Sequence, residues 1–364
     1  MNDCNFPIIL YKPGNNFKNN GVAHGEEFRE QIKELFQIRK NLLLEKNPSI
    51  KNNIQSLALQ QLEETRTFSP DITDEMEGIS QGSLLKIEDI VLLNNYTDFR
   101  DILLPDEGCS TIQSINSLDS LSGQTWDMHN SAKKFVSIIK QDKQENMPAQ
   151  IIFSLVGCVG MMGFNSNGLM IGVNNLNTKN ARASIVWPSL VRKVLQSRSY
   201  DEMESIIKNA PVTSGHNYLI SDETQGSHWE VTPVVREKVS SLTKEKGFIF
   251  HTNHCIGEKT TIEEDKISSN STTNERYQIL NSLNTDNLDF SSALRVLTGH
   301  EGYPKSICSH FESNTQDPSS TCGGALGSFK QNIFRFWRGC PEHDKNFIAY
   351  NFKLSEDRRS FLQV

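Results

Sequence analysis

Apolar side chains recur at helical spacing through the first hundred residues. In residues 28–43 and again in residues 54–62, apolar residues lie three or four positions apart between charged ones, the pattern of an amphipathic helix. The pattern predicts a third helix beginning near Ile72 and a fourth over residues 87–96. Pro105 and the turn-like residues 106–108 then end the helical part.

Beyond residue 109 the chain changes to short segments rich in Ile, Val, Thr and Phe, separated by Gly and Asn, which is typical of strands. The turn residues at 164–168 predict a hairpin. The predicted strands cover residues 110–116, 124–129, 135–141, 150–156, 169–174, 218–221, 228–231 and 248–251, with further strands near the C-terminus. Helical patterns return at residues 187–196, 200–209, 274–283 and 291–297.

This order of elements predicts the fold class. Helices, then strands, then helices and strands again form an α+β order, and a layered sandwich of two sheets fits it better than a parallel doubly wound sheet. Residues 258–274 are charged and rich in Ser and Asn, so we expect an exposed loop there. No internal repeat is visible in the sequence.

Composition and charge narrow the function classes. The 364 residues are 36% hydrophobic, which is enough to bury a sizeable core in one large domain or two ordinary ones. The net charge of -7 and the lack of a basic stripe argue against a nucleic-acid partner. Residues 1–14 are unlike a signal peptide, and no apolar run is long enough to span a membrane.

The cysteines point to a reducing compartment. Seven of them lie far apart, so we expect most to be reduced and structural. They are Cys4, Cys109, Cys158, Cys255, Cys308, Cys322 and Cys340. The C-terminal Leu-Gln-Val lacks a peroxisomal address, so the cytoplasm is the expected location.

The segment around Cys109 is the first candidate for chemistry. Cys109 follows Gly108 where the helical part gives way to a strand, so its thiol can attack the Gly108 carbonyl. After cleavage there, the new α-amine has a pKa near about 7.7–8.0 and can take the thiol proton at neutral pH. An ordinary buried thiol is the alternative interpretation.

Two further residues extend this candidate site. Asp127 lies 18 positions after Cys109, and a hairpin of that length brings a carboxylate back beside the cysteine, although a solvated aspartate in a turn is the alternative. Asn253, in His-Thr-Asn-His-Cys, can donate an amide hydrogen to an oxyanion. His251, His254 and Cys255, extended by Cys308 and His310, can also be interpreted as metal ligands, but their spacing is not that of a usual metal motif.

Five motifs occur in one order along the chain. They are Gly-Cys-Ser-Thr (108–111), Gly-Gln-Thr-Trp-Asp (123–127), Gly-Phe-Asn-Ser-Asn-Gly (163–168), His-Thr-Asn-His-Cys (251–255) and Gly-Tyr-Pro-Lys-Ser-Ile-Cys (302–308). The series resembles the isopenicillin-N acyltransferase family of N-terminal-nucleophile (Ntn) enzymes, which includes the insect β-alanyl-dopamine hydrolases. The similarity extends from about Gly21 to the C-terminus.

The resemblance implies a fold, a processing step and residue roles. The fold would be a four-layer αββα sandwich with two antiparallel sheets. Autocatalytic cleavage between Gly108 and Cys109 would give a helical α chain, residues 1–108, and a catalytic β chain, residues 109–364, which remain together as one domain. Cys109 would be the nucleophile, Asp127 the carboxylate near it, Asn253 the oxyanion donor and Thr111 a supporting hydroxyl.

One departure from the family pattern concerns an arginine. The penicillin-forming acyltransferase carries an arginine in Gly-Lys-Ser-Arg-Gly shortly after its Ser-Ile-Cys motif, whereas residues 315–320 here are Thr-Gln-Asp-Pro-Ser-Ser. No arginine lies between Arg295 and Arg335. A guanidinium that holds the site or a substrate carboxylate is therefore missing or replaced, which argues against penicillin-type substrates.

Three hypotheses follow. The first is a self-processing cysteine amidohydrolase that cleaves a small N-acyl amine or amide through a thioester on Cys109. The second is an acyltransferase that moves an acyl group from a coenzyme A thioester or an amide to an amine, although no phosphate-cradling glycine motif supports coenzyme A binding. The third is a non-catalytic binding module on the same fold. We expect no metal and no cofactor, with coenzyme A only as an acyl donor, and a structural zinc as a remaining alternative.

Overall fold

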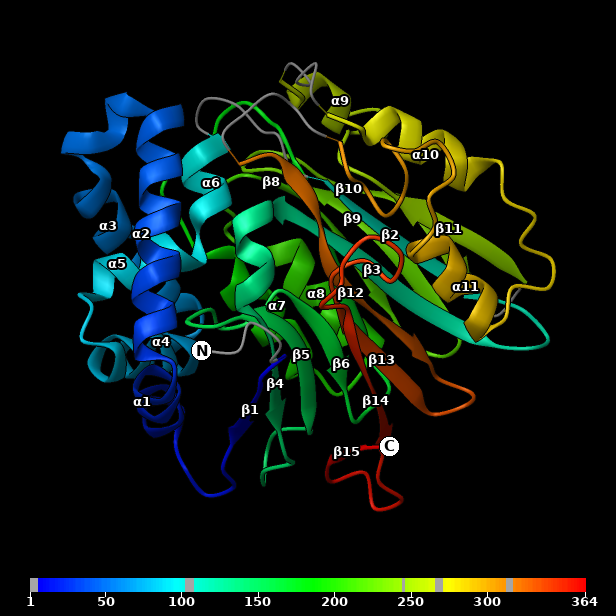
Figure 1. Ribbon diagram of the computed structural model, residues 1–364, viewed down its shortest axis with the longest axis horizontal. Coiled ribbons are helices and arrows are strands. Elements are labelled where there is room, and N and C mark those ends of the chain that lie inside the picture. The colour runs from blue at the N-terminus through cyan, green and yellow to red at the C-terminus, as the bar shows by residue number, and fades with distance from the viewer. Residues whose placement is uncertain (1–5, 102–107, 244–245, 266–270, 312–316) are drawn as a thin grey trace.

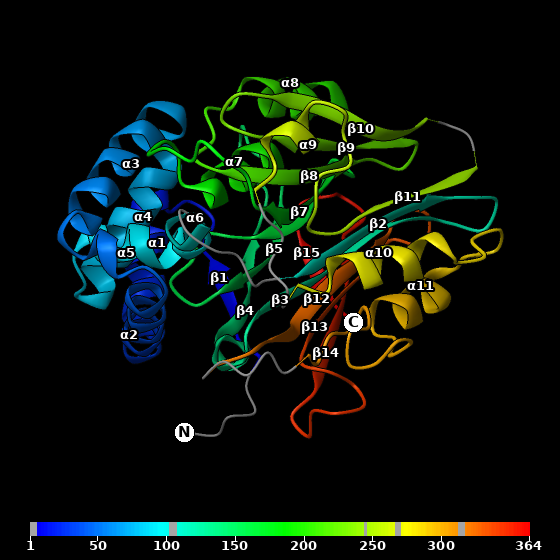
Figure 2. The ribbon, with the colours of Figure 1, turned by 90° about the horizontal axis from the view of Figure 1, so that it is seen from above.

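A computed structural model describes residues 6–101, 108–243, 246–265, 271–311 and 317–364. Two sheets, of eight and seven strands, lie against each other in the middle of the molecule, and helices cover their outer faces (Figures 1 and 2). This arrangement confirms the predicted α+β sandwich with four layers.

The first sheet has the strand order β1-β4-β5-β6-β7-β8-β9-β10. Its strands are β1 (Ile8–Tyr11), β4 (Val136–Gln141), β5 (Gln150–Leu155), β6 (Met162–Asn165), β7 (Met170–Leu176), β8 (Gly215–Ser221), β9 (Gln225–Val231) and β10 (Arg236–Thr243). Neighbouring strands are antiparallel except that β1 runs parallel to β4. The resemblance implied a purely antiparallel sheet, and β1 departs from that expectation.

The second sheet is antiparallel throughout, in the order β11-β2-β3-β12-β13-β14-β15. Its strands are β2 (Cys109–Ile115), β3 (Ser120–His129), β11 (Gly247–His251), β12 (Ser319–Ser328), β13 (Ile333–Arg338), β14 (Ile348–Leu354) and β15 (Phe361–Gln363). Every residue of β2 and β3 is buried because both faces of this sheet are covered.

The N-terminal helices gather on one side of the sandwich (Figure 2). They are α1 (Phe17–Glu27), α2 (Arg29–Lys46), α3 (Ile54–Phe68), α4 (Pro70–Ser83), α5 (Ile87–Asn94) and α6 (Tyr96–Asp101), with a 3-10 turn at Pro48–Asn52. Helices α1 and α4 pack through glycines: a Cβ on Gly21 would lie 2.2 Å from the Glu75 carbonyl oxygen. Their backbones therefore approach as closely as glycine allows.

The remaining helices cover the two outer faces. Helices α7 (Trp187–Leu195) and α8 (Tyr200–Asn209) contact strands of the first sheet, and α11 (Phe290–Leu297) contacts β3 and β12 of the second. Two shorter helices, α9 (Thr260–Glu263) and α10 (Thr273–Asn281), precede α11, and a 3-10 turn covers Asn130–Phe135. A second apolar cluster, which includes Ile112, Leu280 and Trp337, fills the space between the second sheet and this layer.

The structure corrects several expectations. Helix α1 and strands β1 and β10 were not expected, so the segment before Gly108 is not purely helical. The segment 258–274 is not simply an exposed loop, because it contains α9 and the buried Thr260 and Thr273. The expected turn at residues 105–107, Cys4 and residues 312–316 lie outside the described residues. No helix among the described residues is long and apolar enough to cross a membrane.

Candidate active site

Cys109 is the first residue of β2, and the hairpin of β2 and β3 places it beside Asp127. In this antiparallel pair Cys109 lies opposite Trp126, and the Asp127 backbone amide donates to the Gly108 carbonyl oxygen at 2.8 Å. The carbonyl of the bond preceding Cys109 is therefore already hydrogen-bonded by the second strand of the hairpin. The spacing of 18 residues brings the two positions together as predicted.

Gly108 lies close to the charged ends of two side chains. A Cβ at this position would lie 2.6 Å from Asp127 Oδ2 and 2.9 Å from Arg276 Nη2. A side chain at position 108 would therefore require the Asp127 carboxylate and the Arg276 guanidinium to shift.

Arg276 of α10 supplies a guanidinium at this site. The side chain is fully buried, and its Nη1 donates to the Cys109 carbonyl oxygen at 2.6 Å and to Ser110 Oγ at 3.0 Å. Its Nη2 donates to Asn253 Oδ1 at 2.9 Å. A guanidinium therefore lies at this site, and it comes from a different part of the chain than the segment after the Ser-Ile-Cys motif.

Burial and the neighbouring groups have opposite effects on the pKa of Arg276. Burial lowers the pKa of Arg276, while the nearby Asp127, Cys109 and Glu275 act in the opposite direction. A guanidinium stays protonated at neutral pH, so it places a positive charge beside the Cys109 thiol. Such a charge favours the thiolate, which is the reactive form.

Asn253 holds the backbone nitrogen of Cys109. Its side-chain oxygen accepts from the Cys109 amide at 2.7 Å, and its Nδ2 donates to the Asn175 carbonyl oxygen at 2.9 Å. Its own backbone amide donates to Thr273 Oγ1 at 2.7 Å. Asn253 was expected as an oxyanion donor, and the structure adds a contact with the nitrogen that would become the α-amine.

Thr111 lies near Cys109 but acts through other residues. Its hydroxyl donates to Asn174 Oδ1 at 2.8 Å, and Asn174 Nδ2 donates to the Cys109 carbonyl oxygen at 2.9 Å. Asn217 Nδ2 also donates to Asn174 Oδ1, at 2.7 Å. Thr111 therefore helps to fix the backbone of Cys109 through Asn174.

The Asp127 carboxylate is oriented by a hydroxyl from β12. Thr321 Oγ1 donates a hydrogen bond to Asp127 Oδ1 at 2.6 Å. Thr321 Oγ1 also accepts a hydrogen bond from the Ser309 backbone amide at 2.8 Å. The loop that carries Ser309 thus reaches Asp127 through one threonine.

A cavity of about 20 Å³ adjoins Cys109. Its apolar walls come from Trp126, Met128, Val173 and Trp187, and Asp127 and Asn253 supply polar groups. A volume of this size holds about one water molecule. The uncleaved chain therefore has an apolar pocket beside the thiol that is too small for an acyl group.

The histidines of the His-Thr-Asn-His-Cys motif have structural partners. His251 is fully buried, with its Nε2 lying 2.8 Å from Glu230 Oε1. The carboxylate of Glu230 also accepts from the amide of Ile256 at 2.7 Å and from the hydroxyl of Thr260. Burial opposes its ionisation, but these hydrogen bonds and the one to His251 lower the pKa of Glu230. This network fixes the turn that carries Asn253.

The remaining residues of that motif show no sign of a metal site. Burial lowers the pKa of His254 to about 4, and its Nδ1 lies 2.9 Å from Thr273 Oγ1. Burial and the carboxylates nearby raise the pKa of Cys255. Among the described residues, neither of them nor His251 joins a cluster of potential metal ligands.

The profile of the acyl-coenzyme A:6-aminopenicillanic acid acyl-transferase family matches residues 116–322, more than half of the chain. The chain therefore belongs to this family, which places it among the Ntn hydrolases and acyltransferases.

A curated relative carries the same name. The acyl-coenzyme A:6-aminopenicillanic-acid-acyltransferase 40 kDa form of Emericella nidulans is 26% identical over 240 residues. The match covers 65% of this chain and 66% of that protein, slightly less than two thirds of it.

The solved structures that match this chain share little sequence with it. An N-acylethanolamine-hydrolyzing acid amidase ortholog from Caenorhabditis elegans is 14% identical, with a TM-score of 0.43, covering 70% of this chain and 100% of its own. A conjugated bile acid hydrolase mutant from Clostridium perfringens is 12% identical, with a TM-score of 0.44 and coverages of 66% and 91%. A penicillin V acylase from Agrobacterium tumefaciens is 11% identical, with a TM-score of 0.34 and coverages of 69% and 92%.

Proposed function

We propose that this protein is a self-processing cysteine amidohydrolase that cleaves a small N-acyl amine or amide through a thioester on Cys109. The observation that carries the proposal is the set of contacts around Cys109. Its backbone nitrogen is held by Asn253, its carbonyl oxygen by Arg276 and Asn174, and the preceding carbonyl by the Asp127 amide. Both sides of the bond before the thiol are thus fixed.

The first step is cleavage between Gly108 and Cys109. The Cys109 thiol attacks the Gly108 carbonyl carbon, and the negative charge that forms on the oxygen is stabilised by the Asp127 amide, which already donates to it. The carbon–nitrogen bond breaks, the nitrogen takes the thiol proton, and a thioester joins Gly108 to the sulfur. Water hydrolyses this thioester and leaves a free α-amine on Cys109.

The mature enzyme would use the same residue twice. The α-amine, held by Asn253 Oδ1, takes the proton of the thiol, and the thiolate attacks the substrate carbonyl. Asn253 Nδ2 carries two hydrogens, of which Asn175 accepts one, so the other can donate to the oxyanion. The α-ammonium protonates the departing amine, and water then releases the acid and restores the thiol.

The pocket walls suggest the acyl group. Two tryptophans, a methionine and a valine line the space beside the thiol, together with polar residues that include Thr97, Asn175 and His216. An acyl chain can enter only if this small space widens, and the apolar walls then favour an apolar chain over a charged one. Arg276 is fully buried and its guanidinium donates to protein atoms, so it is poorly placed to bind a substrate carboxylate. This agrees with the inference that penicillin-type substrates are not favoured.

The two chains are proposed to remain associated after cleavage. Strand β1, from the segment before Gly108, is hydrogen-bonded to β4 within the first sheet. Glu75 of α4 pairs with Arg192 of α7 at 2.9 Å, with both side chains fully buried. Separating the chains would expose this strand and this ion pair to solvent. We also propose a cytoplasmic location and a small-molecule substrate.

Acyl transfer is the second candidate, and the family and the curated relative favour it by name. The two reactions differ only in the second nucleophile, which is water in hydrolysis and an amine in transfer. In transfer, the amine nitrogen attacks the thioester carbon, loses a proton and displaces the thiolate.

A substrate assay separates the candidates. Cleaved protein is incubated with small N-acyl amines bearing apolar acyl chains, and the released amine is quantified, with Cys109→Ala as the control. Amine release in plain buffer supports the amidohydrolase. Acyl products that form only when a second amine or a coenzyme A thioester is added would support the transferase. No turnover by fully cleaved protein under either condition would favour the binding module.

A further inference from the structure

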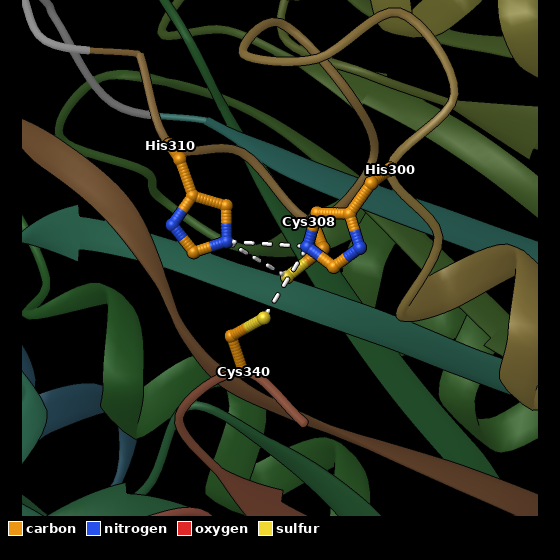
Figure 3. A group of neighbouring side chains, drawn as sticks. All are labelled: His300, Cys308, His310 and Cys340. Carbon is orange, nitrogen blue, oxygen red and sulfur yellow. Dashed lines mark hydrogen bonds between the residues drawn. The ribbon is translucent and has the colours of Figure 1, made fainter. Parts of the chain in front are cut away.

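Two histidines and two cysteines meet in a second cluster on the second sheet's side of the molecule (Figure 3). His300 follows α11, Cys308 and His310 lie in the loop that precedes β12, and Cys340 follows β13. Figure 3 shows the two imidazole rings and the two thiols pointing toward one another. Their donor atoms all lie within 4.8 Å of each other.

The distances match those of a tetrahedral metal site. His300 Nε2 lies 3.3 Å from His310 Nε2 and 3.2 Å from Cys340 Sγ, and Cys308 Sγ lies 3.6 Å from His310 Nε2. A tetrahedral zinc ion with bonds of about 2.0–2.3 Å places neighbouring ligand atoms about 3.3–3.8 Å apart. Three of the six pairs of ligand atoms are thus already close to tetrahedral spacing, and the other three pairs lie within 4.8 Å.

Groups around the cluster orient the ligands. The backbone amides of Glu342 and His343 donate to Cys340 Sγ at 3.4 and 3.3 Å, which favours a thiolate at this sulfur. The Glu342 carboxylate lies 3.2 Å from His300 Nδ1. A carboxylate on that nitrogen keeps the proton there and leaves Nε2 with a lone pair toward the cluster.

We propose that His300 Nε2, Cys308 Sγ, His310 Nε2 and Cys340 Sγ bind one zinc ion. Two thiolates and two neutral imidazoles neutralise the charge of the ion, and its binding releases the two thiol protons to solvent. Four protein ligands leave no open position for a substrate or water, so the ion has a structural role.

This site differs from the metal site considered from the sequence. That alternative joined Cys308 and His310 to His251, His254 and Cys255, whereas the structure joins them to His300 and Cys340. Among the described residues, the four ligands come from three separate parts of the chain. The sequence therefore contains no compact motif that would predict this metal site. The proposal replaces the expectation of a metal-free protein.

The zinc ion would position the proposed active site. Ser309 lies between two ligands, and its amide donates to Thr321 Oγ1, which in turn donates to Asp127 Oδ1. A metal that fixes Cys308 and His310 therefore fixes the hydroxyl that orients Asp127. This role rests on the proposed function, but zinc binding itself does not.

Metal analysis of the full chain tests the proposal. The protein is produced without a histidine tag, reduced, desalted and analysed for zinc by mass spectrometry of the elements. We expect about one zinc per chain in the wild type and in Cys158→Ser, whose cysteine contacts Arg39 and the Leu93 carbonyl far from the cluster in sequence. The double variant Cys308→Ser/Cys340→Ser should retain less than a tenth of that amount.

A measurement on the wild type covers the case in which the double variant fails to fold. Replacement of zinc by cobalt should give thiolate-to-cobalt charge-transfer bands and the intense visible bands of tetrahedral cobalt. Wild-type protein that holds no zinc and takes up neither ion after reduction overturns the proposal. So does a disulfide between Cys308 and Cys340 found by peptide mapping of protein isolated with its thiols blocked. Neither outcome depends on amidase activity, so the zinc site and the proposed function can fail separately.

Discussion

Substitution of Arg276 by lysine keeps the positive charge beside Cys109 but removes the geometry that the guanidinium provides. Arginine donates to the Cys109 carbonyl oxygen at 2.6 Å and to Asn253 Oδ1 at 2.9 Å from two different nitrogens. It also donates to Ser110 Oγ and, through Nε, to Thr272 Oγ1 at 2.9 Å. A single ammonium group cannot occupy all of these positions.

The magnitude follows from the number of hydrogen bonds lost. Lysine would lose at least two charge-assisted hydrogen bonds, each contributing about 1.5–3 kcal/mol. If about 3 kcal/mol of this loss appears in the barrier to cleavage, the rate falls about 100-fold. We therefore expect Arg276→Lys to fold and to self-cleave about 100-fold more slowly than the wild type.

The assay follows the uncleaved chain on denaturing gels, beginning with freshly refolded protein. Alkylation of Cys109 by iodoacetamide, measured across pH, reports the thiolate separately and should change little in Arg276→Lys, because the positive charge is kept. Arg295→Lys is the matched control, because Arg295 is exposed on α11 and contacts Ser292. Self-cleavage of folded Arg276→Lys within twofold of the wild-type rate would refute the assigned role.

Three further substitutions test separate parts of the account. Gly108→Ala places a Cβ 2.6 Å from Asp127 Oδ2. This substitution should lower the free energy of unfolding by about 1–3 kcal/mol and slow self-cleavage about 100-fold. Cleavage at the wild-type rate would contradict the close approach of Asp127 to Gly108. Gly21→Ala places a Cβ 2.2 Å from the Glu75 carbonyl oxygen and should cost about 1–3 kcal/mol in urea unfolding, whereas an unchanged midpoint would show that α1 and α4 can separate. Burial lowers the pKa of His24 to about 3 in the folded chain. As the pH falls below about 6.5, the unfolded chain therefore binds a proton on this histidine and the folded chain does not, so the free energy of unfolding decreases on acidification. His24→Gln should therefore reduce the slope of unfolding free energy against pH between 6 and 4 by about 1.4 kcal/mol per pH unit, and an unchanged slope would contradict the neutral native histidine.

The local pattern of the sequence was sufficient for much of the fold. The spacing of Cys109 and Asp127 predicted their proximity because a hairpin is a local structure whose register depends on few residues. Helix α3 begins at Ile54 and α7 covers Trp187–Leu195, close to the predicted bounds, because each carries a regular apolar stripe.

Elements held by distant contacts could not be predicted in this way. Helix α1 contains few apolar residues and depends on its glycine contacts with α4, and β1 pairs with β4 more than 120 residues further along the chain. Strand β10 lies at an edge of its sheet and carries mostly polar and charged residues, which weakens the strand pattern.

The same limit applied to the site. Arg276 lies in a helix predicted for its apolar spacing, and nothing nearby in the sequence indicates that its side chain reaches Cys109. Its burial becomes apparent only when α10 is placed against β2. The guanidinium beside Cys109 therefore could not be predicted from the segment that follows the Ser-Ile-Cys motif.

The intact mass of the purified protein under denaturing conditions tests the central proposal most directly. Cleavage before Cys109 divides the chain of 41.2 kDa into pieces of about 12 and about 29 kDa, as an N-terminal nucleophile requires. The account predicts these two masses for the wild type and a single mass of 41.2 kDa for Cys109→Ala. A wild-type chain that stays at 41.2 kDa after prolonged incubation in folded form would contradict it.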